Sequence, residues 1–306
     1  MNDAPIALPG MGANGSVWMP KNSDGRYSGP MSLRQALTWS KNMVSIRILM
    51  AMGVPYAKDY IQRFGFKADQ IPASLSMALG SGSVSPMQMA EGYAVFANGG
   101  YKVSNYVIDK IYDGRGTLRA QMQPLVANQN APQVIDPRNA FIMYHMMQDV
   151  VNLGTASRAR SLGRSDIAGK TGTTNDNVDA WFVGFNPNLV TAVYVGFDKP
   201  RSMGRAAFGG TIALPIWVDY MKYALKGKPN VNVPTPKGVV QRGRDYFLQE
   251  YTSTNPDLPL DNRADGPVDR PARNNDDAPD GGDAGGGEAD TEAQTPANNT
   301  QLDSLF

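Results

Sequence analysis

The amino-acid sequence predicts an α/β protein of the α+β kind, in which helices surround an antiparallel sheet. Three apolar segments of strand length follow one another in the second half of the chain, at residues 167–173, 179–185 and 189–197. Only Asn186-Pro187-Asn188 separates the last two, which is typical of a hairpin turn and therefore of antiparallel pairing. Segments with helix caps and helically spaced apolar residues lie on both sides of these strands.

The first half of the chain is predicted to be helical after an irregular start. Residues 1–30 are rich in Gly, Pro and Asn and are expected to form loops. Ser32 and Gln35 have the spacing of a capping box, so a helix should begin there. Two more helices are expected at residues 42–52 and 54–64, because each apolar segment is followed by a glycine that would end it.

The rest of the body alternates between helices and strands. A helix is expected to begin at Pro86, since proline suits the first helical position. Residues 101–121 alternate and contain Asp-Gly, which predicts a hairpin. Asp136 should cap a long helix at residues 137–151, and residues 211–225 should form an amphipathic helix.

The end of the chain has the composition of a disordered acidic tail. Residues 262–306 carry ten acids and three arginines, a net charge of −7, which leaves residues 1–261 with about +8 of the chain's total of +1. Such a segment cannot bury enough apolar surface to offset its ordering entropy. We therefore expect a body at residues 1–250 and a disordered tail at 251–306. A solvated spacer is the first interpretation of the tail, and docking to a partner through Leu302, Leu305 and Phe306 is the alternative.

Several classes of site are not expected. The chain has no cysteine, which excludes disulfides, thiolate catalysis and cysteine zinc sites, and no metal or cofactor is predicted. The single His145 lies in an apolar helical run and is expected to pack in the core, so a histidine-dependent hydrolase triad is not expected. The positive body contains no run of five or more basic residues, and nucleic-acid binding is therefore discounted.

No segment of the sequence is predicted to cross a membrane. A spanning helix needs about 18 consecutive apolar residues, and Arg47 interrupts the best candidate around residues 46–54. The chain does not open with a basic region followed by an apolar region, so no export signal is expected in the sequence as written.

A short motif suggests an anion-binding site at the end of the first predicted strand. Residues 170–174 read Lys-Thr-Gly-Thr-Thr. Lys170 offers a positive charge, Thr171 and Thr173 offer hydroxyl donors, and Gly172 allows a carboxylate to approach the backbone closely. Lys-Thr-Gly is one of three motifs of penicillin-binding and β-lactamase active sites.

The second of these motifs, Ser-x-Asn, occurs at Ser40-Lys41-Asn42, in a predicted turn between two helices. Helix capping is the alternative interpretation of Ser40 and Asn42, since both residue types favour caps. The third motif, Ser-x-x-Lys, carries the nucleophile and does not occur. The nearest equivalent is Thr38-Trp39-Ser40-Lys41, which overlaps the Ser-x-Asn and cannot supply a separate site.

These motifs and their context resemble the transpeptidase domain of class A penicillin-binding proteins. The resemblance covers roughly residues 1–250. It rests on four stretches, which are Trp18–Asn22 with Tyr27–Pro30, Leu33–Leu37 leading to Ser40-Lys41-Asn42, Ser85–Ala90 through Ala97–Gly100, and Ala168–Asn175 with the aromatic strand after it.

The resemblance implies the penicillin-recognising serine transpeptidase or β-lactamase-like fold, in which helices flank a five-stranded antiparallel sheet. In that family two strands and the helix with the nucleophilic serine precede the part that this chain matches. The fold is therefore expected to be incomplete at its N-terminal side, and the chain to be a fragment. The membrane anchor and glycosyltransferase domain of family members would then be missing as well.

The resemblance also implies a reaction and its participants. A serine would attack the penultimate D-alanine of a peptidoglycan stem peptide ending in D-Ala-D-Ala, and an amine would resolve the acyl-enzyme. Ser40, Asn42 and Lys170 would be the catalytic residues present, and Thr171, Gly172 and Thr173 would bind the substrate. Partners would be stem peptides, β-lactams and activators of cell-wall synthesis. The location would be the periplasmic face of the bacterial inner membrane, reached only through the missing anchor.

The absence of Ser-x-x-Lys leaves two alternative functions open and leads to two predictions about the isolated chain. The alternatives are a non-catalytic binding module of the same fold, or vestigial fragment, and a β-lactamase or sensor. Without the nucleophile, residues 1–306 are expected to form no acyl-enzyme with penicillin. The missing strands should also leave Leu33, Ile46 and Val193 partly uncovered, which would favour aggregation.

Overall fold

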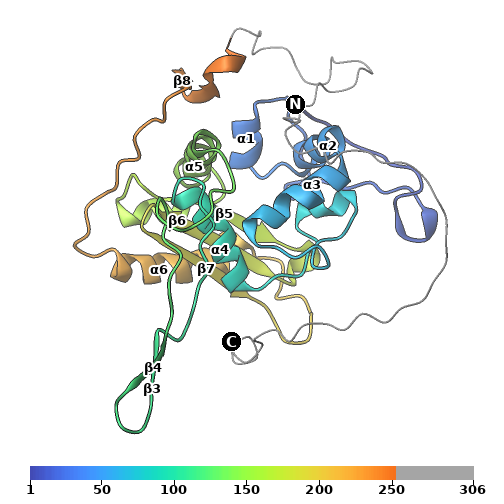
Figure 1. The fold of residues 1–306 in the computed structure, drawn as a ribbon. Helices are drawn as coiled ribbons and strands as arrows, with labels where there is room; N and C mark the ends of the chain where they lie inside the picture. The colour runs from blue at the N-terminus through green and yellow to red at the C-terminus, as the bar shows by residue number, and fades with distance from the viewer. Residues whose placement is uncertain (253–306) are drawn as a thin grey trace, which may run out of the picture. The chain divides into compact units, whose positions relative to one another are not determined.

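The computed structural model describes residues 1–252, and the expected tail beyond Thr252 lies outside the described residues. Figure 1 shows helices packed around a central sheet, as predicted for an α+β protein. The helices of the described part are α1 (Leu33–Thr38), α2 (Asn42–Met52), α3 (Val54–Ile61), α4 (Pro86–Ala97), α5 (Pro137–Asn152) and α6 (Leu214–Ala224). The strands are β1 (Asn2–Asp3), β2 (Gly29–Pro30), β3 (Lys110–Tyr112), β4 (Leu118–Gln121), β5 (Ala168–Thr173), β6 (Ala180–Asn186), β7 (Leu189–Val195), β8 (Val239–Arg242) and β9 (Asp245–Leu248).

The central sheet contains β5, β6 and β7 in that order, and both pairs are antiparallel. The three predicted strands are therefore confirmed, with Pro187 and Asn188 as the turn between β6 and β7. Alternate residues of a strand face opposite sides of the sheet. On β6, Phe182 packs against α6 and Phe185 packs against α4 and α5. The sheet is thus covered on both faces.

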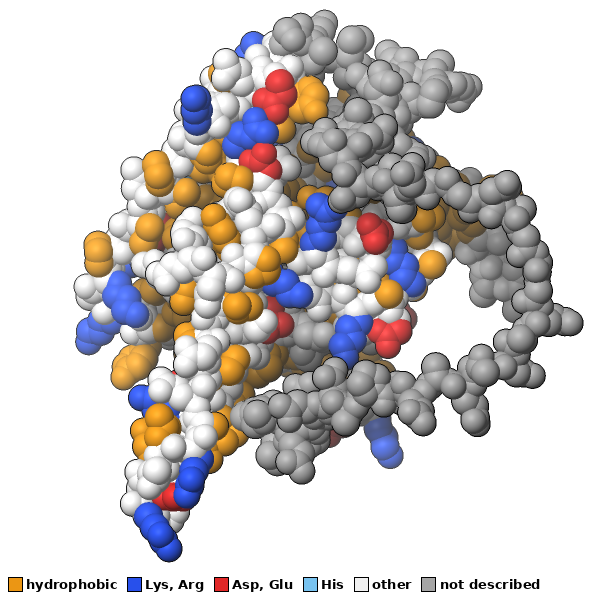
Figure 2. All heavy atoms as spheres, viewed as in Figure 1, with side chains coloured by type: hydrophobic (Ala, Val, Ile, Leu, Met, Phe, Trp, Pro, Cys, Tyr) orange, Lys and Arg blue, Asp and Glu red, His pale blue; other side chains and the backbone are white. Residues whose placement is uncertain are grey.

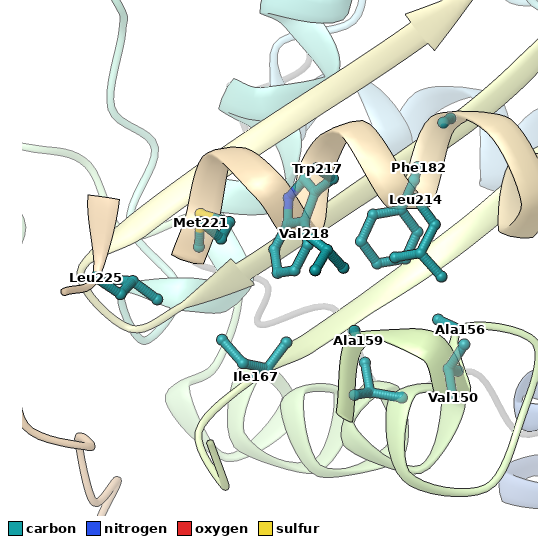
Figure 3. Close-up of a cluster of buried hydrophobic side chains, with 12 residues drawn as sticks. Val150, Ala156, Ala159, Ile167, Phe182, Leu214, Trp217, Val218, Met221 and Leu225 are labelled. Carbon is teal, nitrogen blue, oxygen red and sulfur yellow. The ribbon is translucent and has the colours of Figure 1, made fainter. Parts of the chain in front are cut away.

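Helix α6 covers one face of the sheet (Figure 3). One stripe of its apolar residues, Leu214, Trp217, Val218 and Met221, recurs at helical spacing and is almost completely buried, as the amphipathic pattern predicted. Figure 3 shows Trp217 beside Phe182 of β6, with Ile167 and Ala159 on the other side of the cluster. This cluster includes the largest buried side chains of the described part, namely Trp217 and Phe182.

A glycine on β6 allows this packing. A Cβ at Gly184 would lie 2.7 Å from the Trp217 ring, so any larger residue would push α6 away. The Trp217 Nε1 donates hydrogen bonds to the carbonyls of Gly184 (3.2 Å) and Thr191 (3.1 Å), which satisfies its buried N–H. The indole therefore fixes α6 across β6 and β7.

Helices α2 and α3 form a separate buried cluster with the N-terminal segment. Ile46 is fully buried there, with Ile6, Met43, Leu49 and Leu75 around it. The expectation that Ile46 is partly uncovered is wrong, because residues 6–8 and the 3₁₀ turn Leu75–Leu79 cover it. Leu33 is 41% exposed and Val193 is half-buried.

Most predicted helices are confirmed, because their caps are local. Ser32 accepts a hydrogen bond from the Gln35 N–H and Gln35 Oε1 accepts one from the Ser32 N–H, which completes the predicted capping box. Ser85 and Gln88 do the same at the start of α4. The last turn of the helix predicted at 54–64 is 3₁₀, at Gln62–Phe64.

Three segments differ from the predictions. Residues 1–30 are not only loops, since β1 pairs with β2. The helix expected at 211–225 begins with a π-helical turn at Gly209–Ala213. The hairpin expected at 101–121 is confirmed, but its strands are short, and in Figure 2 it carries hydrophobic and basic side chains on its surface.

A second hairpin, β8–β9, lies near the end of the described part. Arg34 of α1 donates to Asp245 and to Asp149 of α5, and Arg138 of α5 pairs with Glu250. These ion pairs join the hairpin to α1 and α5. The 3₁₀ turn Gln249–Tyr251 spans the boundary expected at residue 250, and the division into body and tail stays a prediction.

Candidate active site

Strand β5 carries the Lys-Thr-Gly-Thr motif and brings Lys170 to the turn between α1 and α2. Lys170 lies opposite Val183 of β6, so its side chain leaves the sheet on the same face as Val183 and Phe185. Its Nζ donates to Ser40 Oγ at 2.8 Å and to the Thr171 carbonyl at 3.1 Å. Two motifs that are 130 residues apart in the chain therefore meet in the structure.

The ammonium group of Lys170 is not neutralised by an acid. Burial lowers its pKa to about 8, because desolvation disfavours the charged form. None of the carboxylates in residues 1–252 forms an ion pair with it. An ammonium that is half-buried and unpaired favours an anionic ligand, because a carboxylate would compensate its desolvation. The Nζ also keeps one N–H beyond its two protein acceptors.

Ser40 occupies an unusual backbone position. Its N–H donates to the Leu37 carbonyl (3.2 Å) and the Lys41 N–H donates to the Ala36 carbonyl (2.9 Å). This pair of bonds is a Schellman motif, in which the residue at the position of Ser40 takes a left-handed conformation and is usually glycine. Ser40 indeed has φ 54°. Non-glycine residues in this region are uncommon and concentrate at functional sites.

Asn42 is the first residue of α2 and points toward the N-terminal segment. Its Nδ2 donates to the Lys21 carbonyl at 2.8 Å, and its Oδ1 accepts no hydrogen bond from the described residues. The capping alternative is contradicted, because the cap position of α2 is Lys41 and no side chain caps this helix. The carboxamide is thus fixed by one bond and has an acceptor available for a ligand N–H.

Thr171 and Thr173 lie on the face of β5 opposite to Lys170, since strand residues alternate. Thr171 Oγ1 shares a hydrogen bond of 2.6 Å with Thr155 Oγ1, and Thr173 Oγ1 accepts the Gly209 N–H at 3.0 Å. Both hydroxyl arrangements leave one hydroxyl hydrogen for another acceptor. Gly172, between them, lies against Trp181, and a Cβ at Gly172 would lie 3.2 Å from that of Trp181.

Two supporting segments were missed from the sequence. Gly154 and Thr155 follow α5, and a Cβ at Gly154 would lie 2.2 Å from the Thr38 carbonyl, so this glycine lets α5 approach α1. Gly209 begins the π-helical turn, and a Cβ there would lie 2.3 Å from the Trp181 carbonyl and 2.5 Å from that of Gly172. The pair Gly209-Gly210 was the one available signal, and π-helical turns are frequent at functional sites.

His145 packs in the core, as expected. Its ring contacts those of Phe141, Tyr144 and Tyr246. Its Nε2 is buried and has no hydrogen-bond partner among residues 1–252, and burial lowers the pKa of the imidazole, so His145 is neutral at pH 7. Within residues 1–252 no three His, Cys, Asp or Glu side chains form a possible metal site. In the same residues, none of the helices has the length and apolar character needed to cross a membrane.

The sequence model of the penicillin binding protein transpeptidase domain matches residues 8–222. The chain belongs to this family. Penicillin-binding protein 1A of Neisseria meningitidis is 63% identical over 320 residues, a match that covers 100% of this chain and 40% of the relative. The resemblance to class A penicillin-binding proteins is thereby confirmed.

Solved structures of the family confirm the predicted fold. The structure of penicillin-binding protein 1A from Haemophilus influenzae matches with a TM-score of 0.76 and 36% identity, over 81% of this chain and 44% of that one. PonA1 from Mycobacterium tuberculosis in complex with penicillin V matches with a TM-score of 0.61 and 25% identity, over 77% of this chain and 65% of that one. The chain spans about a third to two fifths of the length of the curated relatives it matches.

Proposed function

We propose that this chain supplies the carboxylate-binding side of a peptidoglycan D,D-transpeptidase site, in a bifunctional class A penicillin-binding protein. The observation that carries the proposal is the ammonium of Lys170, which has no ion-pair partner among residues 1–252 and lies 2.8 Å from Ser40 Oγ on a Lys-Thr-Gly-Thr strand. The substrates would be stem peptides ending in D-Ala-D-Ala, whose terminal carboxylate matches the charge of Lys170.

The resemblance to the family gives each site residue a role, and the contacts of Lys170, Ser40 and Asn42 support the roles of these three residues. Lys170 would bind the terminal carboxylate and hold Ser40, whose hydroxyl would pass a proton to the leaving amine. Asn42 Oδ1 would accept the substrate amide N–H, since Lys21 already fixes the other end of the carboxamide. Thr171 and Thr173 would donate to the carboxylate, and the Thr173 N–H would be half of the oxyanion hole.

Strand β5 suits a peptide substrate because it lies at the edge of the described sheet. Within residues 1–252 it pairs only with β6. An extended peptide can add to such an edge through its main chain, and the site side chains then select its end group. Gly172 keeps this edge accessible, since it has no side chain above the strand.

The chain itself holds no candidate nucleophile of the Ser-x-x-Lys type. In Thr38-Trp39-Ser40-Lys41, the Thr38 hydroxyl donates to the Arg34 carbonyl at 2.8 Å. Lys41 is 4% exposed and ion-paired with Asp24 at 2.8 Å, so it cannot serve as a base for Thr38. We therefore expect residues 1–306 alone to form no acyl-enzyme, and stoichiometric penicillin labelling of that purified chain would contradict this.

Several wider properties follow from the proposal. β-Lactams would be ligands, and penicillin V is bound in the M. tuberculosis PonA1 complex. The protein would act in cell-wall synthesis at the periplasmic face of the inner membrane, with effects on cell shape and antibiotic resistance. Activators of cell-wall synthesis would be its protein partners, and no nucleic acid would be bound.

Labelling with a fluorescent penicillin tests the proposal. The protein that the native gene encodes should become covalently labelled, and Lys170→Ala or Ser40→Ala should lower the second-order labelling rate by about 100-fold or more. Lys67→Ala removes an exposed lysine and serves as the control. Equal labelling of all four proteins would contradict the proposal. Stem-peptide binding without any labelling would instead indicate the non-catalytic module.

A further inference from the structure

Lys41 lies between Ser40 and Asn42, and its side chain points away from the site. Its Nζ is 2.8 Å from Asp24 Oδ2 and 3.5 Å from Asp3 Oδ2, and it donates to the Arg26 carbonyl at 3.2 Å. The Lys41 side chain is 5% exposed and that of Asp3 is 0% exposed. A buried ammonium with three oxygen partners is held in one place, because leaving any of these charges unpaired is costly.

The same N-terminal segment also holds the next two residues of the turn. Asn42 Nδ2 donates to the Lys21 carbonyl at 2.8 Å, and the Met43 N–H donates to Asn22 Oδ1 at 3.3 Å. Asn22 in turn donates to Asp3 Oδ1 at 2.7 Å. Three consecutive residues, from Lys41 to Met43, are therefore attached to a segment that lies about 20 residues earlier in the chain.

The conformation of Ser40 gives this attachment a role in the site. Serine does not favour a left-handed backbone, because its Cβ then comes too close to the following carbonyl oxygen. The conformation persists only where the surroundings hold it. Lys41 follows Ser40 directly, and its backbone N–H closes the Schellman motif while its side chain is fixed by Asp3 and Asp24.

We propose that Lys41 is a positioning residue, whose buried cluster with Asp3 and Asp24 keeps Ser40 Oγ within hydrogen-bond distance of Lys170 Nζ. The inference rests on the proposed transpeptidase function and deepens it. The middle residue of Ser-x-Asn then matters for the reaction without contacting the substrate. Its charge and length are specific to the two aspartates on the N-terminal segment.

A double-mutant cycle separates this role from simple stabilisation of the fold. The acylation rate by a fluorescent penicillin is measured for Lys41→Met in the protein that the native gene encodes, with and without Ser40→Ala. Lys41→Met should lower the rate about 10- to 100-fold in the otherwise unchanged protein, since small displacements of reacting groups have effects of that size. In the Ser40→Ala background it should lower the rate less than about twofold, because the residue it positions is already absent.

Control variants show whether a change in the acylation rate comes from the position of Ser40, from misfolding or from failure of the proposed function. Lys67→Met should change neither the rate nor the melting temperature, since Lys67 is exposed and makes no ion pair in the described part. If Lys41→Met does not fold, Asp24→Asn repeats the cycle with a half-exposed partner and an expected loss of about two- to fivefold. Equal losses in both Ser40 backgrounds, or no loss in either, would overturn the positioning role. If Ser40→Ala and Lys170→Ala themselves leave the acylation rate unchanged, this result contradicts the proposed function and not only the positioning role of Lys41.

Discussion

Ser40 and Lys170 both occupy environments that their residue types do not favour. Ser40 has the left-handed backbone that glycine prefers, and Lys170 has a half-buried ammonium without a counter-ion among residues 1–252. Local rules are often broken at functional sites and obeyed elsewhere. The hydrogen bond of 2.8 Å between Lys170 Nζ and Ser40 Oγ therefore indicates that these two residues serve the site and not the stability of the fold.

Substitution of Ser40 should separate stability from function. Ser40→Gly and Ser40→Ala both remove the hydroxyl, so both should slow acylation of the native protein by about 100-fold or more. Ser40→Gly should nevertheless have a free energy of unfolding about 1–2 kcal/mol higher than Ser40→Ala, because only glycine adopts φ 54° without steric cost. Urea unfolding of the two variants measures this difference. Equal stability of the two variants, or a more stable alanine variant, would show that the left-handed backbone at residue 40 is not strained.

The lowered pKa of Lys170 predicts that stability depends on pH. With a folded pKa of about 8 against 10.5 for the free side chain, the cost of the buried charge is fully present below pH 8. Between pH 8 and 10.5 the unfolded chain binds more protons, so the free energy of unfolding rises with pH, by about 2–3 kcal/mol. The free energy of unfolding is compared with that of Lys170→Met at each pH, because groups other than Lys170 titrate in both proteins and their contribution cancels in the difference.

That comparison has a defined contrary result. The parent and Lys170→Met should differ in the slope of unfolding free energy against pH only above about pH 8. Parallel curves from pH 7 to 10.5 would mean that the Lys170 ammonium is not desolvated in the folded protein.

The motif residues could be predicted from the sequence, but their supports could not. Lys170 and Ser40 belong to short motifs with recognisable chemistry. Thr155 and Gly209 reach the site only through the packing of α5 and of the π-helical turn, and no local pattern encodes that contact. The left-handed conformation of Ser40 was also hidden, because serine is an ordinary residue at a helix end.

The π-helical turn before α6 supports strand β5 at the site. Gly209 donates its N–H to Thr173 Oγ1, and its Cα lies close against the backbone of Gly172 and Trp181. The extra residue of the π turn gives α6 a wider first turn, which brings this N–H to the motif strand. The turn therefore connects the helix on one face of the sheet to the end of β5.

A methyl group at Gly209 should displace β5. Its Cβ would lie 2.3 Å and 2.5 Å from two carbonyl oxygens, and backbone atoms cannot move as a flexible side chain can. Gly209→Ala should lower the free energy of unfolding by about 1–3 kcal/mol and slow acylation of the native protein. Gly114→Ala is the matched control, since its Cβ meets nothing within 4 Å, and it should change stability by less than about 0.5 kcal/mol. Equal effects of the two variants would contradict this account.

Helices with local caps were predicted more accurately than elements fixed by distant contacts. The capping boxes at Ser32 and Ser85 each depend on four consecutive residues, and both are present in the structure. The β8–β9 hairpin was missed because Arg34 and Arg138 attach Asp245 of β9 and the following Glu250 to α1 and α5 over more than 100 residues. The π-helical turn was missed because its apolar pattern continues that of α6.

In the molecule as a whole, the site lies where three groups of elements meet. Strand β5 brings Lys170, the α1–α2 turn brings Ser40, and the end of α5 brings Thr155. The end of α5 shares one buried cluster with β6 and α6, α2 belongs to a second cluster, and ion pairs from Arg34 join α1 to α5 and β9. The family motifs indicated β5 and the α1–α2 turn as parts of one site, whereas the end of α5 and the contacts that hold the parts together required the structure.

The charge of the chain predicts that its last segment is separate from the fold. Removal of residues 262–306 takes away a net charge of −7 and few large apolar side chains. The melting temperature of the shortened protein should stay within about 2 °C of the parent, because a solvated segment contributes little to folding. Calorimetry of both proteins measures this. A large fall in melting temperature would instead indicate docking through Leu302, Leu305 and Phe306.

Recognition of a ligand carboxylate by Lys170 is tested most directly with a penicillin and its methyl ester. The second-order acylation rates of the two compounds are compared in the protein that the native gene encodes and in its Lys170→Ala variant. The parent should react about 10- to 100-fold faster with the free acid than with the ester, since hydrogen bonds to charged groups contribute about 1.5–3 kcal/mol. In Lys170→Ala the ratio should fall close to 1. An unchanged ratio in the variant would show that Lys170 does not bind the carboxylate.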